Sequence, residues 1–313
     1  YIKNNFNKMK NLNEFIIESL HTKYTVQPKN YNELLRIVNS TLKQGKYDLN
    51  FIDTSEITDM SMLFAGNKCD FDVSNWDVSK VTNMQDMFVG CVNFTGKGLE
   101  KWDVSNLKNM ENMFCNCKNF TGKSIKNWNV SKVNNMFKTF GGCEKFNCDL
   151  SKWNVSNVKT MIDTFKNCIA FVGKGLENWD VSKVNNMDDM FYGCKKFIGK
   201  SIENWNVSNV KDMSNTFNGC IKFNCDLSSW NTSNVQFMEK TFYGCENFIG
   251  KGLEKWNVSN VENSEYMFYN CKKLKCDLSD WYISSVHYDN MYAMFDGCKK
   301  MTSPKWYRYK IKL

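Results

Sequence analysis

The most regular feature of the chain is an apolar pattern that recurs along most of its length. Between residues 150 and 171 the pattern reads L-x-x-W-x-V-S-x-V-x-x-M-x-x-x-F-x-x-C-x-x-F. All ten tryptophans occupy the W position, at successive intervals of 26, 26, 25, 26, 26, 25, 26, 25 and 25 residues. A fixed period of this length is typical of solenoids, whose repeats bury their apolar side chains only by stacking on their neighbours.

Each repeat contains the signals of two short elements. Apolar and polar residues alternate around Trp153 and Val155, which favours a short strand. After Val158 the apolar spacing becomes three and four residues, which favours a short helical or 3-10 turn. The predicted fold class is therefore an α/β repeat solenoid: a right-handed, leucine-rich-repeat-like array with a parallel sheet on one face, short helices on the other and a helical N-terminal cap.

The pattern also predicts the division of the chain. Residues 1–50 lack the repeat, and their apolar spacing indicates one helix within residues 6–20 and another around residues 34–42. Because the end of a solenoid exposes an apolar face, we interpret residues 1–50 as a helical N-terminal cap or arm. Residues 51–301 are predicted to be the solenoid of about ten repeats, and residues 302–313 a basic C-terminal tail or cap.

Two types of loop lead to the next tryptophan. The longer type contains Gly-Lys-Gly or Gly-Lys-Ser, the shorter reads Cys-Asp-Leu-Ser, and two longer loops usually precede one shorter loop. We expect the glycines to adopt positive φ in turns. Gly-Lys-Ser at Gly122 and Gly199 is not a phosphate-binding loop, because that motif needs another glycine five residues earlier, where Cys117 and Cys194 stand.

The net charge of +8 is concentrated at the two ends. Residues 1–50 carry eight Lys or Arg against four acidic residues, and residues 299–313 carry six basic residues and no acid. These ends are either solvated tails or contacts for an acidic partner, an anionic lipid surface or nucleic acid. The array resembles no nucleic-acid groove, so no nucleic-acid partner is expected. No run of 18 apolar residues predicts a transmembrane segment.

The unit W-[DN]-V-S-x-V-x-x-M-x-x-[MT]-F-x-x-C-x-x-F resembles the BspA-like leucine-rich repeat. The variant it resembles is abundant in mycoplasma surface lipoproteins and is also seen in some large DNA viruses. Residues 52–60, IDTSEITDM, resemble the usual opening of such arrays, and the match covers residues 51–301. The resemblance implies a solenoid for surface display or protein binding, with no catalytic residues and no cofactor. The many cysteines and the absence of a lipobox cysteine depart from the lipoprotein pattern.

Cysteine and tryptophan each hold one position of the repeat, and we predict that both form buried structural ladders. Reduced thiols are preferred to disulfides, because stacked side chains in register point the same way. Zinc binding by pairs such as Cys143 and Cys148 is the weaker alternative, since the spacing is not typical of zinc sites. The two predicted ladders are Trp76, Trp102, Trp128, Trp153, Trp179, Trp205, Trp230, Trp256 and Trp281, and Cys91, Cys117, Cys143, Cys168, Cys194, Cys220, Cys245 and Cys271.

Outward polar positions next to the tryptophans and the basic C-terminus are the predicted partner contacts. The first set is polar and monotonous, without the aromatic and arginine anchors of typical interfaces, so binding through caps or loops is equally plausible. The predicted contacts are Asp77, Asp103, Asn129, Asn154, Asp180, Asn206, Asn231, Asn257, Tyr282, Lys305, Arg308, Lys310 and Lys312.

The functional prediction is a non-enzymatic repeat protein. We expect a structural or protein-interaction component of a virion or cell surface, folded in a reducing compartment, whose partners are other proteins of a larger assembly such as a capsid or cell envelope. The alternative is a bacterial-type surface adhesin or host-interaction lipoprotein. An enzyme is the least favoured class, because no acid–base, nucleophilic or metal-ligand pattern is present, and neither a metal nor a cofactor is predicted.

Overall fold

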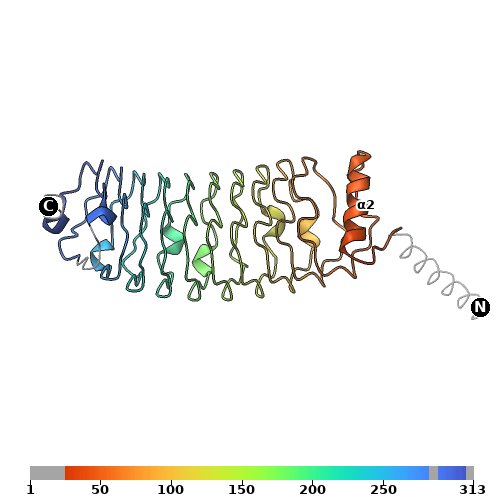
Figure 1. The fold of residues 1–313 in the computed structure, drawn as a ribbon, viewed down its shortest axis with the longest axis horizontal. Coiled ribbons are helices and arrows are strands. Elements are labelled where there is room, and N and C mark those ends of the chain that lie inside the picture. Colours follow the sequence, from red (N-terminus) through yellow and green to blue (C-terminus); the bar gives the residue numbers. More distant parts are fainter. Residues whose placement is uncertain (1–24, 282–287, 308–313) are drawn as a thin grey trace, which may run out of the picture.

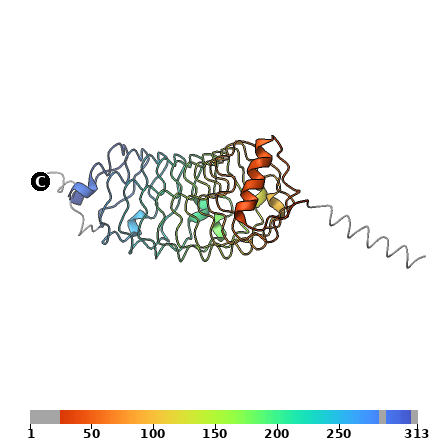
Figure 2. The same ribbon diagram turned by 45° about the vertical axis from the view of Figure 1, so that its right-hand side comes forward.

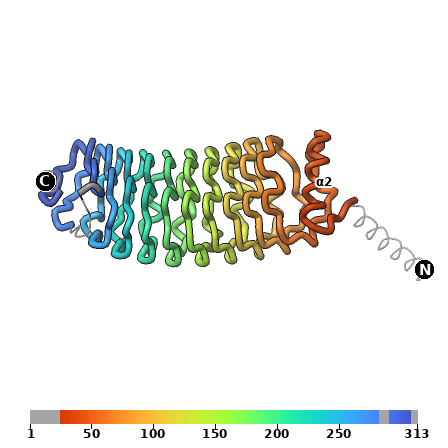
Figure 3. Tube along the Cα trace, in the orientation of Figure 1, coloured from red at the N-terminus to blue at the C-terminus, as the bar shows by residue number. Residues whose placement is uncertain are grey.

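The computed structural model describes residues 25–281 and 288–307, and these residues form a rod of stacked coils (Figure 1). Seen obliquely, the coils surround a common interior, and the Cα trace shows each coil lying against the next (Figures 2 and 3). The helices are α2 (Tyr31–Lys43) and the 3-10 helices η1 (Leu99–Lys101), η2 (Lys123–Ile125), η3 (Leu176–Asn178), η4 (Lys200–Ile202), η5 (Leu253–Lys255) and η6 (Tyr288–Met291).

Helix α2 covers the N-terminal end of the rod (Figure 1). It begins after Asn30, whose side chain accepts a hydrogen bond from the Glu33 N–H, a typical N-cap. Its buried side chains include Leu34 and Val38, and the Tyr31 hydroxyl donates to the Ser61 carbonyl of the first coil at 2.7 Å. The helix predicted around residues 34–42 is therefore confirmed, whereas the one predicted within residues 6–20 lies outside the described residues.

The predicted α/β leucine-rich-repeat architecture is wrong. The described residues contain no β-strand and no sheet, and the only strand-type pairing among them is a series of isolated parallel bridges between neighbouring coils. These bridges lie at positions such as Asn83 and Asn109, seven residues after a tryptophan, and not at the tryptophan where the strand was expected. The short helix predicted after Val158 is also absent. The 3-10 helices η1 to η5 occur in the connecting loops, as at Leu176–Asn178, and η6 lies at the start of the last turn segment.

Consecutive turns replace both predicted elements. Left-handed backbone at Asp86 (φ 56°) and Gly90 (φ 72°) interrupts any strand or helix. The glycine position holds glycine or asparagine in every described coil, the residue types that tolerate this conformation best. The turns return an apolar side chain to the interior every third or fourth residue, which explains why the sequence pattern resembled that of a helix.

Backbone donors in this turn segment alternate between two tasks. The N–H groups of residues 84, 86, 88 and 90 donate to carbonyls of the following coil at 2.7–3.0 Å, and those of residues 87, 89 and 91 donate to the residue three positions earlier at 3.0–3.2 Å. The Gln85 N–H donates to the Asn83 side chain at 3.2 Å. Every N–H from residue 84 to residue 91 therefore has an acceptor without a sheet. We call this arrangement the turn ladder.

Stacked aromatic side chains fill the interior. One column holds a phenylalanine from each coil, from Phe64 to Phe295, with neighbouring ring centroids 5.4–5.8 Å apart. The tryptophans form another, and each of the ten indole N–H groups donates to a carbonyl of the preceding coil at 2.8–3.3 Å. These bonds give each buried indole N–H an acceptor, which it would otherwise lack.

The cysteine column makes similar bonds. In nine coils, from Cys91 to Cys298, the thiol donates to the carbonyl of the column phenylalanine in the preceding coil at 2.9–3.1 Å. All fourteen cysteines are free. Burial raises the pKa of Cys143 and Cys168 well above its usual value, and that of Cys91 to about 12. The thiols of the column therefore stay protonated and unreactive, and they pack as part of the core.

The order of the loop types follows from contacts between neighbouring coils. Lys174 of a Gly-Lys-Gly loop pairs with Asp149 of the preceding Cys-Asp-Leu-Ser loop at 2.8 Å, and Lys251 pairs with Asp226 in the same way at 2.7 Å. Gly175 has φ 91°, and a Cβ placed there would lie 2.2 Å from the backbone nitrogen of Ser151. A Gly-Lys-Gly loop therefore packs against the Cys-Asp-Leu-Ser loop that precedes it. This contact explains why a longer loop follows a shorter one.

Substitution of Gly175 by alanine should destabilise the fold strongly. Gly219→Ala is the matched control, because Gly219 also has positive φ but its added Cβ would approach no atom closer than 3.6 Å. The control should cost only the left-handed penalty of about 1–2 kcal/mol, whereas Gly175→Ala should cost about 1–3 kcal/mol more, because backbone has to move. Urea unfolding midpoints measure the difference, and equal midpoints for the two variants would contradict this packing.

Thiol labelling should separate the column cysteines from Cys69, which is only partly buried. In the folded protein at pH 8, a maleimide-type reagent should modify Cys69 readily and leave Cys143, Cys168 and Cys220 unmodified, because these three thiols are buried and protonated. Their modification should begin only at urea concentrations that unfold the chain, as read by mass spectrometry of peptides. Rapid labelling of Cys168 without urea would show that the column is not closed.

Candidate functional site

The polar positions predicted as a binding face are engaged by the backbone. In eight coils the Asp or Asn after the tryptophan accepts a hydrogen bond from the serine N–H two residues on, at 2.9–3.2 Å, which is an Asx turn. These residues are Asp77, Asp103, Asn129, Asn154, Asp180, Asn206, Asn231 and Asn257. Of the other predicted contacts, Lys305 is exposed, while Tyr282, Arg308, Lys310 and Lys312 lie outside the described residues.

A shallow depression of about 410 Å³ lies on this face at the first coils. It brings Asp77 and Asp103 together with Lys101 beside the edge of Trp76. Hydrogen bonds from the Ser105 backbone and side chain hold the pKa of Asp103 below its usual value. The carboxylates here are therefore turn-forming acceptors, and the lowered pKa of Asp103 is the opposite of the shift that a general acid needs.

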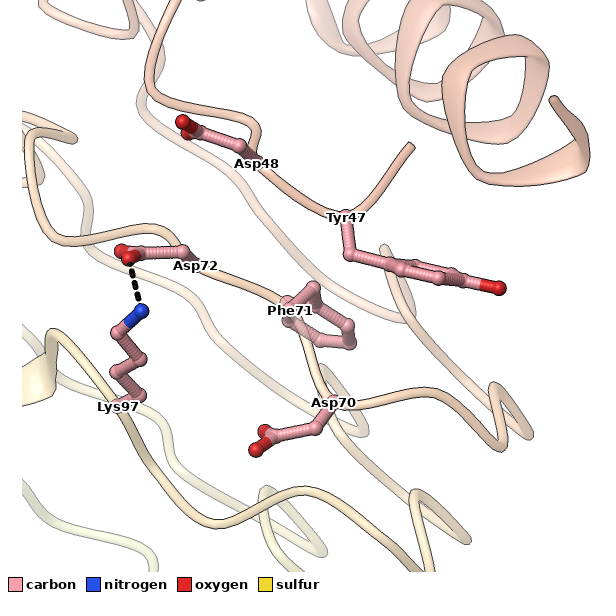
Figure 4. Close-up of a pocket in the computed structure, with 6 residues that line it drawn as sticks. All are labelled: Tyr47, Asp48, Asp70, Phe71, Asp72 and Lys97. Atoms are coloured by element: carbon pink, nitrogen blue, oxygen red, sulfur yellow. Dashed lines mark ion pairs between the residues drawn. The ribbon is translucent and has the colours of Figure 1, made fainter. Parts of the chain in front are cut away.

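A second depression, of about 280 Å³, lies between the segment after α2 and the first coils (Figure 4). Its polar centre is the ion pair of Lys97 Nζ and Asp72 at 2.7 Å, and the Tyr47 ring points away from it. Burial alone would raise the pKa of Asp72, but hydrogen bonds from Lys97, Ser74 and Asn50 outweigh it and hold the pKa well below its usual range.

The other carboxylates of this depression are also engaged locally. Asp70 accepts hydrogen bonds from the N–H and hydroxyl of Thr95 at 3.1 and 2.9 Å, and Asp48 accepts two from Asn50 at 3.0 and 2.8 Å. The Lys97–Asp72 pair itself repeats the loop contact described above for the later coils. We conclude that this depression belongs to the repeat architecture, because its carboxylates are held by contacts within and between coils.

The described residues contain neither a group of metal ligands nor a Gly-Lys-Ser loop with an exposed serine hydroxyl. No three of their His, Cys, Asp or Glu side chains are grouped to hold a metal ion, and both histidines, His21 and His287, lie outside them. The hydroxyls of Ser124 and Ser201 in the Gly-Lys-Ser loops are buried, so they do not face a phosphate. Of the helices that are described, none combines the length and apolar character of a membrane span.

Four tyrosines gather on the outer side of the turn ladder near its C-terminal end. The Tyr243 and Tyr269 rings stack with centroids 4.8 Å apart, and Tyr266 meets Tyr269 at 5.8 Å and Tyr292 at 5.4 Å edge to face. Tyr292 is 58% exposed, and Phe237 nearby along the ladder is 39% exposed. We call Tyr243, Tyr266, Tyr269 and Tyr292 the tyrosine cluster. Sequence reasoning missed it because these residues were assigned to a helix rather than to an exposed face.

Acidic side chains continue the same face toward the middle of the rod. Lys166 Nζ lies 3.0 Å from Asp163 and 2.6 Å from Asp189, and 5.2 Å from the centre of the Tyr192 ring. Burial and then the negative charges of Asp189 and Asp212 raise the pKa of Asp188 to about 6. Burial also raises the pKa of Asp189, although Lys166 opposes the shift.

Comparison with known proteins identifies a family. No curated protein matches the chain. Four overlapping segments, residues 32–123, 90–199, 165–251 and 198–306, match a family described as "Mycoplasma protein of unknown function, DUF285". The match agrees with the mycoplasma-type repeat expected from the sequence, but it does not support the BspA-like leucine-rich assignment. Because the matched segments together span residues 32–306, the chain belongs to the DUF285 family of repeat proteins.

Proposed function

We propose that the chain is a non-enzymatic interaction scaffold that presents the tyrosine cluster to another protein. The cluster carries the proposal, because it brings three half-buried tyrosines and the exposed Tyr292 into mutual contact at the surface, whereas the other exposed apolar side chains, such as Met62 and Val172, make no such group. Tyrosine supplies a large contact area at low entropic cost and a hydroxyl that bonds at a wet rim, and it is enriched among the residues that dominate binding energy.

The fold supports this role by holding the tyrosines in place before binding. Each tyrosine of the cluster stands on the turn ladder, whose backbone donates hydrogen bonds to the next coil, as Tyr266 N–H does to the Tyr292 carbonyl at 2.9 Å. Neighbouring rings also restrict each other, as the stacked Tyr243 and Tyr269 do. A partner therefore pays little ordering entropy when it binds such a surface.

The structural component of a virion or cell surface and the surface adhesin are two versions of this proposal. Both need an elongated scaffold with a binding face, and they differ in where the partner is located. Identification of the partner distinguishes them: a co-assembling structural protein supports the first, and a host-surface protein supports the second.

Loss of two tyrosines of the cluster should weaken partner binding strongly without unfolding the chain. We expect Tyr269→Ser combined with Tyr292→Ser to weaken capture of the partner from native source material at least about 30-fold, as for loss of interface hot spots. Tyr47→Ser is the control, because Tyr47 is also exposed, at 44%, but lies at the other end of the rod. Quantitative mass spectrometry of cross-linked complexes measures capture, and urea unfolding checks the fold.

Two results would contradict the proposal. One is a wild-type chain that captures no protein reproducibly. The other is a folded Tyr269→Ser, Tyr292→Ser variant that captures the same proteins in the same amounts as the Tyr47→Ser control.

A further inference from the structure

The outer side of the turn ladder in the C-terminal half has an uneven charge. We define the acidic turn face as the outward side chains of residues 160–166, 186–192, 212–218, 237–243 and 263–269. These segments contain six acidic residues and two lysines, although the chain as a whole is basic. The charged residues are Asp188, Asp189, Asp212, Glu239 and Glu265, with Lys166 and Lys240, and Asp163 is buried beside Lys166.

Both lysines of this face are already neutralised. Lys166 pairs with Asp163 and Asp189, and Lys240 pairs with Glu239. By contrast, Asp188, Asp212 and Glu265 make no ion pair with any lysine or arginine in the part of the chain that the structure describes. The face therefore has a surplus of negative charge next to the tyrosine cluster.

The two lysines also show how cations sit on this surface. Lys166 Nζ lies 5.2 Å from the centre of the Tyr192 ring, and Lys240 Nζ lies 5.4 Å from that of Tyr266. Each cation thus contacts a tyrosine ring and a carboxylate of the same or the next coil. Tyr243, Tyr269 and Tyr292 offer further rings of the same kind. The carboxylate of Glu265, which makes no ion pair among the described residues, lies on the same turn as Tyr266 and Tyr269.

We propose that the acidic turn face, including the tyrosine cluster, binds an extended arginine- or lysine-rich segment of another protein. This inference rests on the proposed function and specifies the partner's chemistry. Carboxylates neutralise the cations, and the tyrosine rings stack on guanidinium groups or on the apolar stems of lysines. The coils repeat in register along the face, so Asp188, Glu239 and Glu265, which hold one repeat position, are regularly placed along it, with Ser214 at that position in the coil between Asp188 and Glu239.

Titration within the face gives the proposal a pH signature. Asp188 lies near Asp189, Asp212 and Asp163 and accepts a hydrogen bond from Asn215, while Lys166 pairs with the adjacent Asp189; burial and these negative charges raise the pKa of Asp188 to about 6. Arginine keeps its charge throughout the range from pH 5 to pH 7. Affinity for an arginine-rich segment should therefore rise as the pH rises from 5 to 7, because Asp188 loses its proton in this window.

A fluorescent deca-arginine peptide tests the proposal by anisotropy with the full chain at fixed ionic strength. Asp188→Asn combined with Asp212→Asn should weaken binding at least about tenfold at pH 7, and Asp188→Asn alone should remove most of the pH dependence. Glu56→Gln combined with Glu144→Gln is the matched control, because it removes two exposed carboxylates elsewhere and should change affinity less than about twofold. Tyr269→Ser should also weaken binding.

The outcomes separate this inference from the proposed function. Equal loss of affinity in the Asp188/Asp212 variant and in the control would show that deca-arginine binds through non-specific electrostatic attraction to the whole chain. This result would overturn the inference. A tyrosine-dependent partner that binds the cluster through a neutral or acidic surface would also overturn it, while the proposed function would stand. If the chain associates with itself through its own basic residues 299–313, the ligand of the face is another copy of this chain and not a second protein. This result would also overturn the proposal.

Discussion

The hydrogen bonds of the turn ladder are the constraint on which the rest of the structure depends. In each coil, every second N–H of the turn segment finds its acceptor only in the following coil. A single repeat would leave those donors without protein partners, so the repeat is stable only in a stack. The requirement also fixes the register between coils, and the register in turn aligns the phenylalanine, tryptophan and cysteine columns.

Polar atoms inside the columns obey the same constraint. Each tryptophan N–H and each column thiol reaches back to a carbonyl of the preceding coil, as Trp153 does to Ile125 and Cys168 does to Phe140. On the outside, the Asp or Asn after each tryptophan is used to close a turn. Most of the polar groups that recur in every repeat therefore serve the fold, and residues that depart from the repeat, such as the tyrosine cluster, are the ones left to serve binding.

The repeat length, the apolar positions and the N-terminal helix could be predicted from the sequence, because they depend only on periodicity and capping signals. The sheet could not be distinguished from the turn ladder in this way. Alternation at Trp153 and Val155 looks the same in a strand and in an irregular coil, and three-to-four spacing looks the same in a helix and in consecutive turns. The glycine or asparagine before each column cysteine was the available signal for left-handed backbone. Tyr243, Tyr269 and Tyr292 come together only once the register is known.

The central claim, a ladder of turns in place of a sheet, is tested most directly by solution NMR of the isotopically labelled chain. Scalar couplings should show left-handed φ at Asp86, Asp163 and Asp189, and couplings across hydrogen bonds should connect the Phe88 N–H to the Met113 carbonyl of the next coil. Extended φ values at Asp86, Asp163 and Asp189, with continuous strand pairing through Trp153 and Val155, would contradict the account and restore the sheet.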